Sequence, residues 1–198
     1  FRTEQKAVGM SDAVLVERRG RALIITINRP EVRNAMNLAV AQGVADAVDE
    51  LDNSPELSVA VITGAGGNFS AGMDLKAFAK GEFPYVVGRG MGFTEKPPVK
   101  PIIAAVEGNA LAGGTELVLA CDLIVAAKNA RFGLPEVKRG LVPGAGGLIR
   151  LPDRVPLQKA LEWSLTGEPF TAEDAERYGL INILTEEGGA LDAAIALA

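Results

Sequence analysis

The chain of 198 residues contains no histidine. This excludes Ser-His-Asp and Cys-His machinery, metal sites with histidine ligands and acid–base catalysis by imidazole. Cysteine occurs once, as Cys121. A single cysteine forms no internal disulfide, which favours a reducing cytoplasm, and argues against a structural zinc site. We therefore expect no metal, and proton transfer near neutral pH falls to carboxylates, tyrosine, lysine or the one thiol.

Long apolar runs are also missing. No run reaches the roughly 18 residues of a membrane span, and the N-terminal residues lack the apolar core of a secretory signal, so no membrane partner is expected. The formal net charge of −5 argues against nucleic acid as a partner. No glycine is followed by the Lys-Ser or Lys-Thr of a P-loop, and residues 64–67 lack the third glycine of the dinucleotide fingerprint. Small molecules, including anionic ones, remain as ligands.

The length and the 48% of apolar residues are typical of one domain with a substantial core. We assign residues 11–198 to a single domain and interpret residues 1–10 as an N-terminus that is disordered or foreign to the natural chain. Residues 80–98 are interrupted by glycine and proline and are interpreted as a mobile loop or lid.

Strand and helix patterns alternate along the chain, which predicts an α/β fold. The predicted strands span residues 14–18, 22–27, 59–63, 102–106 and 122–127. The predicted helices span residues 37–52, 114–120, 156–165, 171–177 and 190–198, with a short one starting near Asp74. A repeated strand–strand–helix unit fits this order at least as well as a doubly wound sheet.

Two glutamates stand in glycine-rich frames. Glu116 follows Gly113 and Gly114 at the start of a predicted helix, and Glu136 follows Gly133 and precedes the glycines of residues 144–147. Glycines at a helix start let a ligand approach backbone N–H groups that favour an oxyanion. Paired carboxylates beside such donors suit a reaction that moves protons at a carbon next to a carbonyl.

Each of these features has a purely structural alternative. The glycines could form a tight turn that packs strand against helix, and Glu116 could only complement the helix dipole. Glu136 could be a surface cap paired with Lys138 or Arg139. The apolar run after Glu116 implies burial, and a buried carboxylate is costly without a task or a partner. With histidine absent, we favour an enzyme that uses both carboxylates.

Four ordered motifs support this interpretation. They lie at residues 28–36 (Asn-Arg-Pro-Glu-Val-Arg-Asn-Ala-Met), 69–75 (Phe-Ser-Ala-Gly-Met-Asp-Leu), 100–116 and 132–147. With them, the chain resembles the crotonase (enoyl-CoA hydratase/isomerase) family from about Val14 onward. The resemblance implies an α/β crotonase-like spiral of strand–strand–helix units. Members of the family continue beyond a point equivalent to Ala198, so it also implies that the C-terminal helices are partly absent from this chain.

The resemblance implies a ligand and site residues. The substrate would be an acyl-CoA thioester, with no separate cofactor because coenzyme A is part of the substrate, and the assembly a homotrimer or a dimer of trimers. The backbone N–H groups of Met73 and Gly113 map to the oxyanion hole, and Glu116 and Glu136 map to the catalytic carboxylates. The residues that map to CoA or substrate binding are Arg29, Arg33, Ala71, Asp74, Leu75, Lys76 and Gly114.

Because both glutamates are kept, the chain looks like an enoyl-CoA hydratase. Such an enzyme is a hydro-lyase that adds water in syn fashion across the C2=C3 bond of a 2-enoyl-CoA, in fatty acid or related acyl-CoA metabolism. By the family analogy, Glu116 is the base toward water and Glu136 is the acid that protonates C2. The alternatives are an enoyl-CoA isomerase, a carnitinyl-CoA-type dehydratase, or a non-catalytic acyl-CoA-binding member of the same fold.

Overall fold

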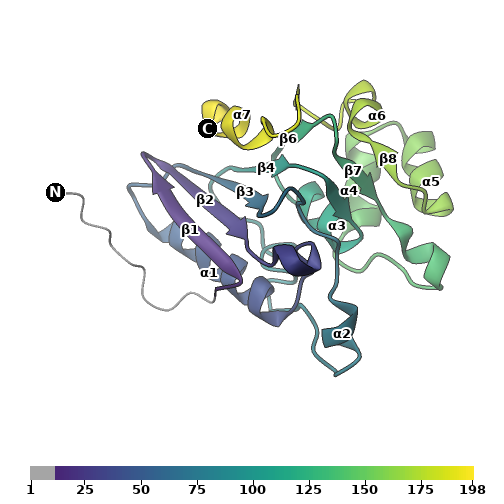
Figure 1. Ribbon diagram of the computed structural model, residues 1–198, viewed down its shortest axis with the longest axis horizontal. Coiled ribbons are helices and arrows are strands. Elements are labelled where there is room, and N and C mark those ends of the chain that lie inside the picture. The colour runs from purple at the N-terminus through teal and green to yellow at the C-terminus, as the bar shows by residue number, and fades with distance from the viewer. Residues whose placement is uncertain (1–11) are drawn as a thin grey trace.

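The computed structural model describes residues 12–198, and the interpretation of residues 1–10 lies outside this range. A six-stranded sheet has the order β1-β2-β3-β4-β6-β9, and a smaller sheet has the order β5-β7-β8 (Figure 1). The large sheet consists of β1 (Val14–Arg19), β2 (Ala22–Ile27), β3 (Val59–Gly64), β4 (Ile102–Val106), β6 (Leu123–Ala127) and β9 (Ile183–Thr185). The small sheet consists of β5 (Asn109–Leu111), β7 (Arg131–Gly133) and β8 (Phe170–Thr171).

Helices connect and cover these strands. The α-helices are α1 (Leu38–Asn53), α2 (Leu75–Phe78), α3 (Gly113–Leu119), α4 (Gly147–Arg154), α5 (Leu157–Thr166), α6 (Ala172–Arg177) and α7 (Ala190–Leu197). Two short 3₁₀ helices are η1 (Pro30–Val32) and η2 (Pro135–Arg139). Among residues 12–198, no helix is long and apolar enough to cross a membrane.

The strand–strand–helix unit is confirmed. Strand β4 is followed by β5 and α3, and β6 is followed by β7 and α4, so each turn contributes one strand to each sheet. The hairpin of β1 and β2 is antiparallel, whereas β2, β3, β4, β6 and β9 pair in parallel. The chain therefore has the predicted α/β spiral rather than a doubly wound sheet.

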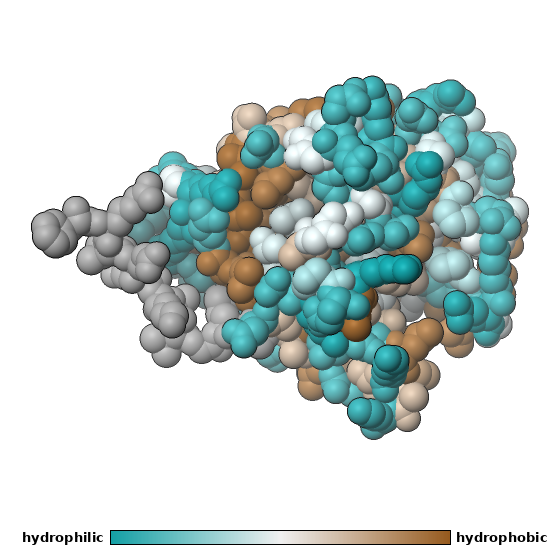
Figure 2. All heavy atoms as spheres, viewed as in Figure 1, coloured by the Kyte–Doolittle hydropathy of each residue, from teal (hydrophilic) through white to brown (hydrophobic). Residues whose placement is uncertain are grey.

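The two faces of the large sheet are packed differently. On one face, β2 and β3 residues such as Leu23 and Ile62 join α1 and α3 in the main core. On the other face, Ile24 and Val61 pack with Ala190 and other residues of α7. Figure 1 shows α7 beside the large sheet, and Figure 2 shows apolar residues gathered over the region of β2 and β3 within a largely hydrophilic surface.

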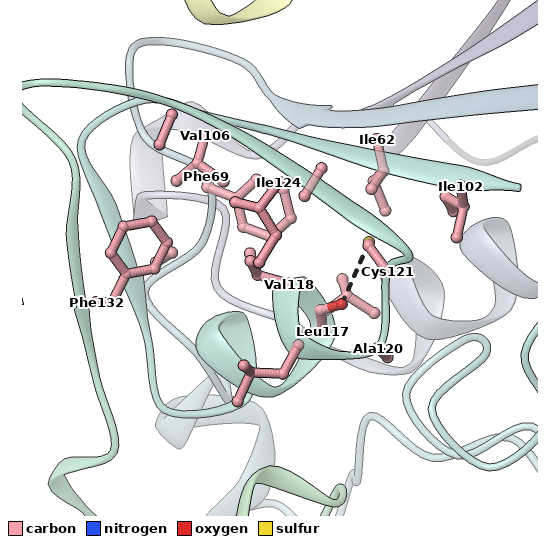
Figure 3. Close-up of a cluster of buried hydrophobic side chains, with 14 of the residues drawn as sticks. Ile62, Phe69, Ile102, Val106, Leu117, Val118, Ala120, Cys121, Ile124 and Phe132 are labelled. Atoms are coloured by element: carbon pink, nitrogen blue, oxygen red, sulfur yellow. Dashed lines mark hydrogen bonds between the residues drawn. The ribbon is translucent and has the colours of Figure 1, made fainter. Parts of the chain in front are cut away.

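Helix α3 is buried in this core along its whole length. Leu117 and Val118 lie among apolar side chains that include Ile124 of β6 and Phe69 of the segment after β3 (Figure 3). At the end of the helix, the Cys121 Sγ donates to the Leu117 carbonyl at 3.5 Å. Burial raises the pKa of the Cys121 thiol, which removes it from proton transfer near neutral pH. The packing fixes α3 as a rigid base for the residues at its N-terminus.

Some short elements have no counterpart in the predictions. Strands β5, β7, β8 and β9 have two or three residues each, too few to show alternation. Helix α4 follows Gly146 in a left-handed conformation and contains Pro152, and both residues weaken a helical pattern. In the predicted loop of residues 80–98, the structure has only an isolated bridge between Val86 and Gly90.

Candidate active site

Two segments lie side by side at the site, one after β3 of the large sheet and one after β5 of the small sheet. The first, after β3, forms a parallel bridge from Met73 to Met36, in which the Met36 N–H donates to Gly72 and the Asp74 N–H donates to Met36. In this pattern the N–H of Met73 itself points away from Met36. Met73 lines the main pocket.

The second segment is the turn from β5 into α3. Ala112 has φ 51° and ψ −124°, a strained backbone conformation for a residue with a side chain. Its N–H donates to the Gly133 carbonyl at 2.8 Å. Gly113 is the first residue of α3, so its N–H has no acceptor within the helix. Gly113 also lines the pocket.

Gly72 lets these two segments approach. It has φ +90°, and a Cβ there would lie 2.8 Å from the Leu111 carbonyl oxygen and 2.9 Å from the Ala112 Cβ. The same Cβ would lie 3.4 Å from the Gly113 nitrogen. Only glycine fits this contact, which brings Met73 and Gly113 to one wall of the pocket.

Glu116 lies one turn into α3 and is 3% exposed. Its Oε1 accepts hydrogen bonds from the N–H groups of Ala145 at 2.7 Å and Gly147 at 2.9 Å. Burial raises the pKa of Glu116, against the opposing effect of the Gly147 and Ala145 N–H groups and of Arg150. The carboxyl is thus fixed in direction and is easier to protonate than an exposed glutamate.

Glu136 lies in η2 directly after β7 and is half-buried. Burial is the main cause that raises its pKa to about 7, and the nearby Glu116 carboxyl adds to the increase. Its Oε2 is buried and has no hydrogen-bond partner among residues 12–198. A carboxyl with this pKa and an unpartnered oxygen is suited to exchange a proton near neutral pH.

Backbone pairing brings the two glutamates together. Strand β7 pairs with β5 in parallel, with Leu111 opposite Gly133. The Gly133 N–H donates to the Thr115 Oγ1 at 3.0 Å, and the Thr115 hydroxyl contacts the carbonyls of Ala110 and Gly133. Glu116 and Glu136 each come shortly after one of these paired strands, so both reach the same pocket.

The pocket has a volume of about 480 Å³. Its lining includes Met73, Gly113, Glu116 and Glu136 together with a largely apolar wall. The loop of residues 80–98 supplies part of that wall through Pro84, Tyr85, Met91, Thr94 and Glu95. The weak periodicity of residues 80–98 predicts a mobile loop or lid, but nothing in the sequence indicates which of its side chains face the pocket.

Of the residues predicted to bind CoA or substrate, some line the pocket and others lie outside it. Ala71 and Leu75 line the pocket. Arg33 and Lys76 are exposed outside its lining. Gly114 is buried behind it, where a Cβ would lie 2.5 Å from the Ser70 carbonyl oxygen. Binding of CoA by these residues stays a prediction.

Arg29 and Asp74 contact each other. The Arg29 Nη1 lies 2.9 Å from the Asp74 Oδ2, with side chains 19% and 12% exposed, and it also donates to the Ala35 carbonyl. Asp74 caps α2 by accepting from the Lys76 and Ala77 N–H groups. Burial alone would raise the pKa of Asp74, but these N–H groups and Arg29 lower it overall. The pair ties η1 to the segment that carries Met73.

The arrangement provides two backbone N–H groups and two carboxyl groups around one apolar pocket. Two N–H groups can stabilise an oxyanion, and two carboxyls with raised pKa values can move protons on the adjacent carbon atoms. Among residues 12–198, no group of three or more histidine, cysteine, aspartate or glutamate side chains could hold a metal ion.

A family profile, curated relatives and solved structures all point to the same protein family. The profile of the family described as enoyl-CoA hydratase/isomerase matches residues 17–198. An enoyl-CoA hydratase of Mycobacterium tuberculosis is 41% identical over 199 residues, covering 93% of this chain and 72% of that protein. A carnitinyl-CoA dehydratase of Salmonella paratyphi A is 43% identical over 194 residues, covering 96% of this chain and 74% of that protein. A crystal structure of an enoyl-CoA hydratase from Mycobacterium tuberculosis H37Rv superposes with a TM-score of 0.93 at 65% identity, covering 94% of this chain and 74% of that one.

Proposed function

The chain belongs to the enoyl-CoA hydratase/isomerase family, and from this premise we infer that it is a hydro-lyase that hydrates 2-enoyl-CoA thioesters. The observation that carries this inference is the presence of Glu116 and Glu136, both with raised pKa values, in one pocket beside Gly113. A hydration needs one group to take a proton from water and a route for a proton to reach C2. Two such carboxyls supply both functions without histidine.

In the proposed reaction, the thioester carbonyl accepts hydrogen bonds from the N–H groups of Met73 and Gly113. These donors stabilise the enolate-like charge that develops on the oxygen, and one donor of this type contributes on the order of 3 kcal/mol. Glu116 acts as base toward water as the oxygen adds to C3, and Glu136 delivers a proton to C2. The water and the proton add to the same face of the double bond, in syn fashion.

The electrostatics favour this division of roles. The two N–H groups on Glu116 Oε1 stabilise a carboxylate, as a base requires. The pKa of about 7 leaves Glu136 about half protonated at neutral pH, as an acid requires. Coenzyme A enters as part of the substrate, so no separate cofactor is invoked. A homotrimer or dimer of trimers, a place in fatty acid metabolism and a cytoplasmic location belong to the same proposal.

The test is hydration of crotonyl-CoA, followed as loss of the enoyl absorbance. A panel of enoyl-CoA thioesters of increasing chain length then identifies the preferred acyl group. A carnitinyl-CoA-type dehydratase, the activity named for several relatives, would instead prefer the trimethylammonium-bearing enoyl-CoA. Binding of these thioesters without turnover would contradict the proposed activity and favour a non-catalytic acyl-CoA-binding protein. Migration of the double bond without water addition would favour an isomerase.

A further inference from the structure

Arg150 joins two loops that border the pocket. It lies in α4, and its Nη1 donates to the Ala145 carbonyl at 2.9 Å. Its Nη2 donates to the carbonyl of Thr94, which belongs to the loop of residues 80–98. Thr94 and Ala145 both line the pocket. One guanidinium group therefore binds two segments that are far apart in the sequence, one through each of its two terminal nitrogens.

Ala145 connects this guanidinium to Glu116. Its carbonyl accepts from Arg150, while its own N–H donates to the Glu116 Oε1 at 2.7 Å. The Gly147 N–H, two residues later, donates to the same oxygen at 2.9 Å. A displacement of the Ala145–Gly147 segment would therefore move both donors that set the direction of the Glu116 carboxyl.

Gly146 leaves room for the guanidinium. It has φ +100°, and a Cβ on it would lie 2.1 Å from the Arg150 Nη1 and 3.0 Å from its Cζ. A residue with a side chain would displace the guanidinium from the Ala145 carbonyl. The positive φ and the absence of a side chain at Gly146 thus both allow the Arg150 guanidinium to reach the Ala145 carbonyl.

We propose that Arg150 is a positioning residue for the hydration, which ties the loop of residues 80–98 and the Ala145–Gly147 segment into one unit that aims the Glu116 carboxyl. This inference rests on the proposed function. Arg150 does not line the main pocket, so it acts through the backbone it holds. Its task is to keep the base in the direction from which it takes a proton, since small displacements at a catalytic group cost much of the rate.

The charges around Glu116 give the inference a measurable consequence. Burial raises the pKa of Glu116, while the Gly147 and Ala145 N–H groups and the Arg150 charge lower it. The other charged groups on this pocket are Glu136 in η2, Arg139 at the end of η2 and Glu95 in the loop. Removal of Arg150 takes away one lowering influence and loosens the segment that carries two more. The pKa of Glu116 then rises further.

The test compares Arg150→Met with Arg154→Met. Arg154 is a matched control, because it also lies in α4 and donates to a backbone carbonyl, that of Cys121, away from the pocket. We expect Arg150→Met to lower kcat roughly 10- to 100-fold and to move the acid limb of the pH profile to higher pH. Arg150→Lys, which keeps the charge and one donor, should recover part of both. Arg154→Met should change thermal stability and leave the pH profile in place.

Two further measurements keep the test decisive. Gly146→Ala retains the arginine but displaces its guanidinium, so it should reproduce the changes of Arg150→Met even if that variant folds poorly. The pKa of Glu116 is also measured directly by NMR of ¹³C-labelled glutamate carboxyls, assigned with Glu116→Gln. If the wild-type protein hydrates no thioester, the proposed function fails, but this titration still tests Arg150. An unchanged Glu116 pKa in folded Arg150→Met, or equal losses of kcat in Arg150→Met and Arg154→Met, overturns the inference.

Discussion

Glu116 and Glu136 face one pocket, but only the Glu116 carboxyl accepts hydrogen bonds from the N–H groups of Ala145 and Gly147. The Glu116 Oε1 accepts two N–H groups, whereas the Glu136 Oε2 is buried and finds no partner in residues 12–198. Burial raises the pKa of both carboxyls, and the Glu116 carboxyl contributes to the rise at Glu136. One group is thus oriented to accept a proton, and the other is left with a proton to deliver.

We expect Glu116→Gln and Glu136→Gln each to lower kcat by roughly 10²- to 10⁴-fold. An amide keeps the shape of the carboxyl but exchanges no proton. The affinity for a saturated acyl-CoA, measured by calorimetry, should stay within a few-fold of wild type, as should the circular dichroism spectrum. A variant that kept more than half of the wild-type turnover would lose its assigned role.

The double variant Glu116→Gln/Glu136→Gln should be little slower than the slower single variant. If both carboxyls act on the same water molecule in the same proton-transfer step, the loss of either one disables that step. Single-turnover rates of the four proteins give the coupling. Additive losses on a logarithmic scale would mean that the two groups act in separate steps, or that one is only structural.

Stability should depend on pH through Glu136. Its folded-state pKa of about 7 lies above the ordinary glutamate value of 4.5, so between these values the folded state binds more protons than the unfolded state. The free energy of unfolding therefore falls as pH rises from about 4.5 to about 7, and stays lower above that range. Glutamine does not ionise, so the Glu136→Gln variant should not show this pH-dependent loss of unfolding free energy.

We expect Glu136→Gln to exceed wild type in unfolding free energy by roughly 1–3 kcal/mol at pH 8, after allowance for solvent screening. At pH 4 the two proteins should be nearly equal. Urea denaturation at both pH values measures the difference. A Glu136→Gln variant less stable than wild type at pH 8 would show that the carboxylate is stabilised in the fold rather than penalised.

Gly113→Ala and Gly113→Pro should differ in how far they lower turnover. Proline removes the N–H assigned to the oxyanion hole, so turnover should be lost. Alanine keeps that N–H, but its Cβ would lie 2.4 Å from the Met91 Cε, the flexible end of a side chain. The double variant Gly113→Ala/Met91→Ala should therefore be faster than Gly113→Ala alone. Full activity in a Gly113→Pro variant with wild-type circular dichroism would remove Gly113 from the oxyanion hole.

Arg29→Met distinguishes a structural role from CoA binding. Because the Arg29 guanidinium contacts Asp74 and the Ala35 carbonyl, we expect its loss to lower the free energy of unfolding by about 1–3 kcal/mol. Arg33→Met, an exposed neighbour in the same motif, is the control and should change stability little. A higher KM for Arg29→Met at unchanged stability would instead support the predicted contact with CoA.

Part of this protein follows from local sequence. The strands over residues 14–27 and 59–63 and the helix of residues 37–52 agree with their predicted bounds to within one or two residues, because each has a long apolar pattern and a capping residue such as Asn37 marks the helix start. The absence of histidine by itself limits the groups that can transfer protons. The glycine-rich stretches around Glu116 and Glu136 can be picked out from the sequence, and both contribute residues to the pocket lining.

Other features exist only because distant segments meet. Strands β5 and β7 are three residues long and are stabilised by each other and by Thr115, so neither carries a readable pattern alone. The pairing of Arg29 with Asp74 and the reach of Arg150 to two carbonyls depend on side-chain placement after the spiral has formed. The raised pKa of Glu136 likewise depends on burial and on the approach of Glu116. Composition and periodicity thus determined the elements and the candidate carboxyls. Tertiary packing alone decided their direction and protonation, because both depend on what surrounds a side chain in space.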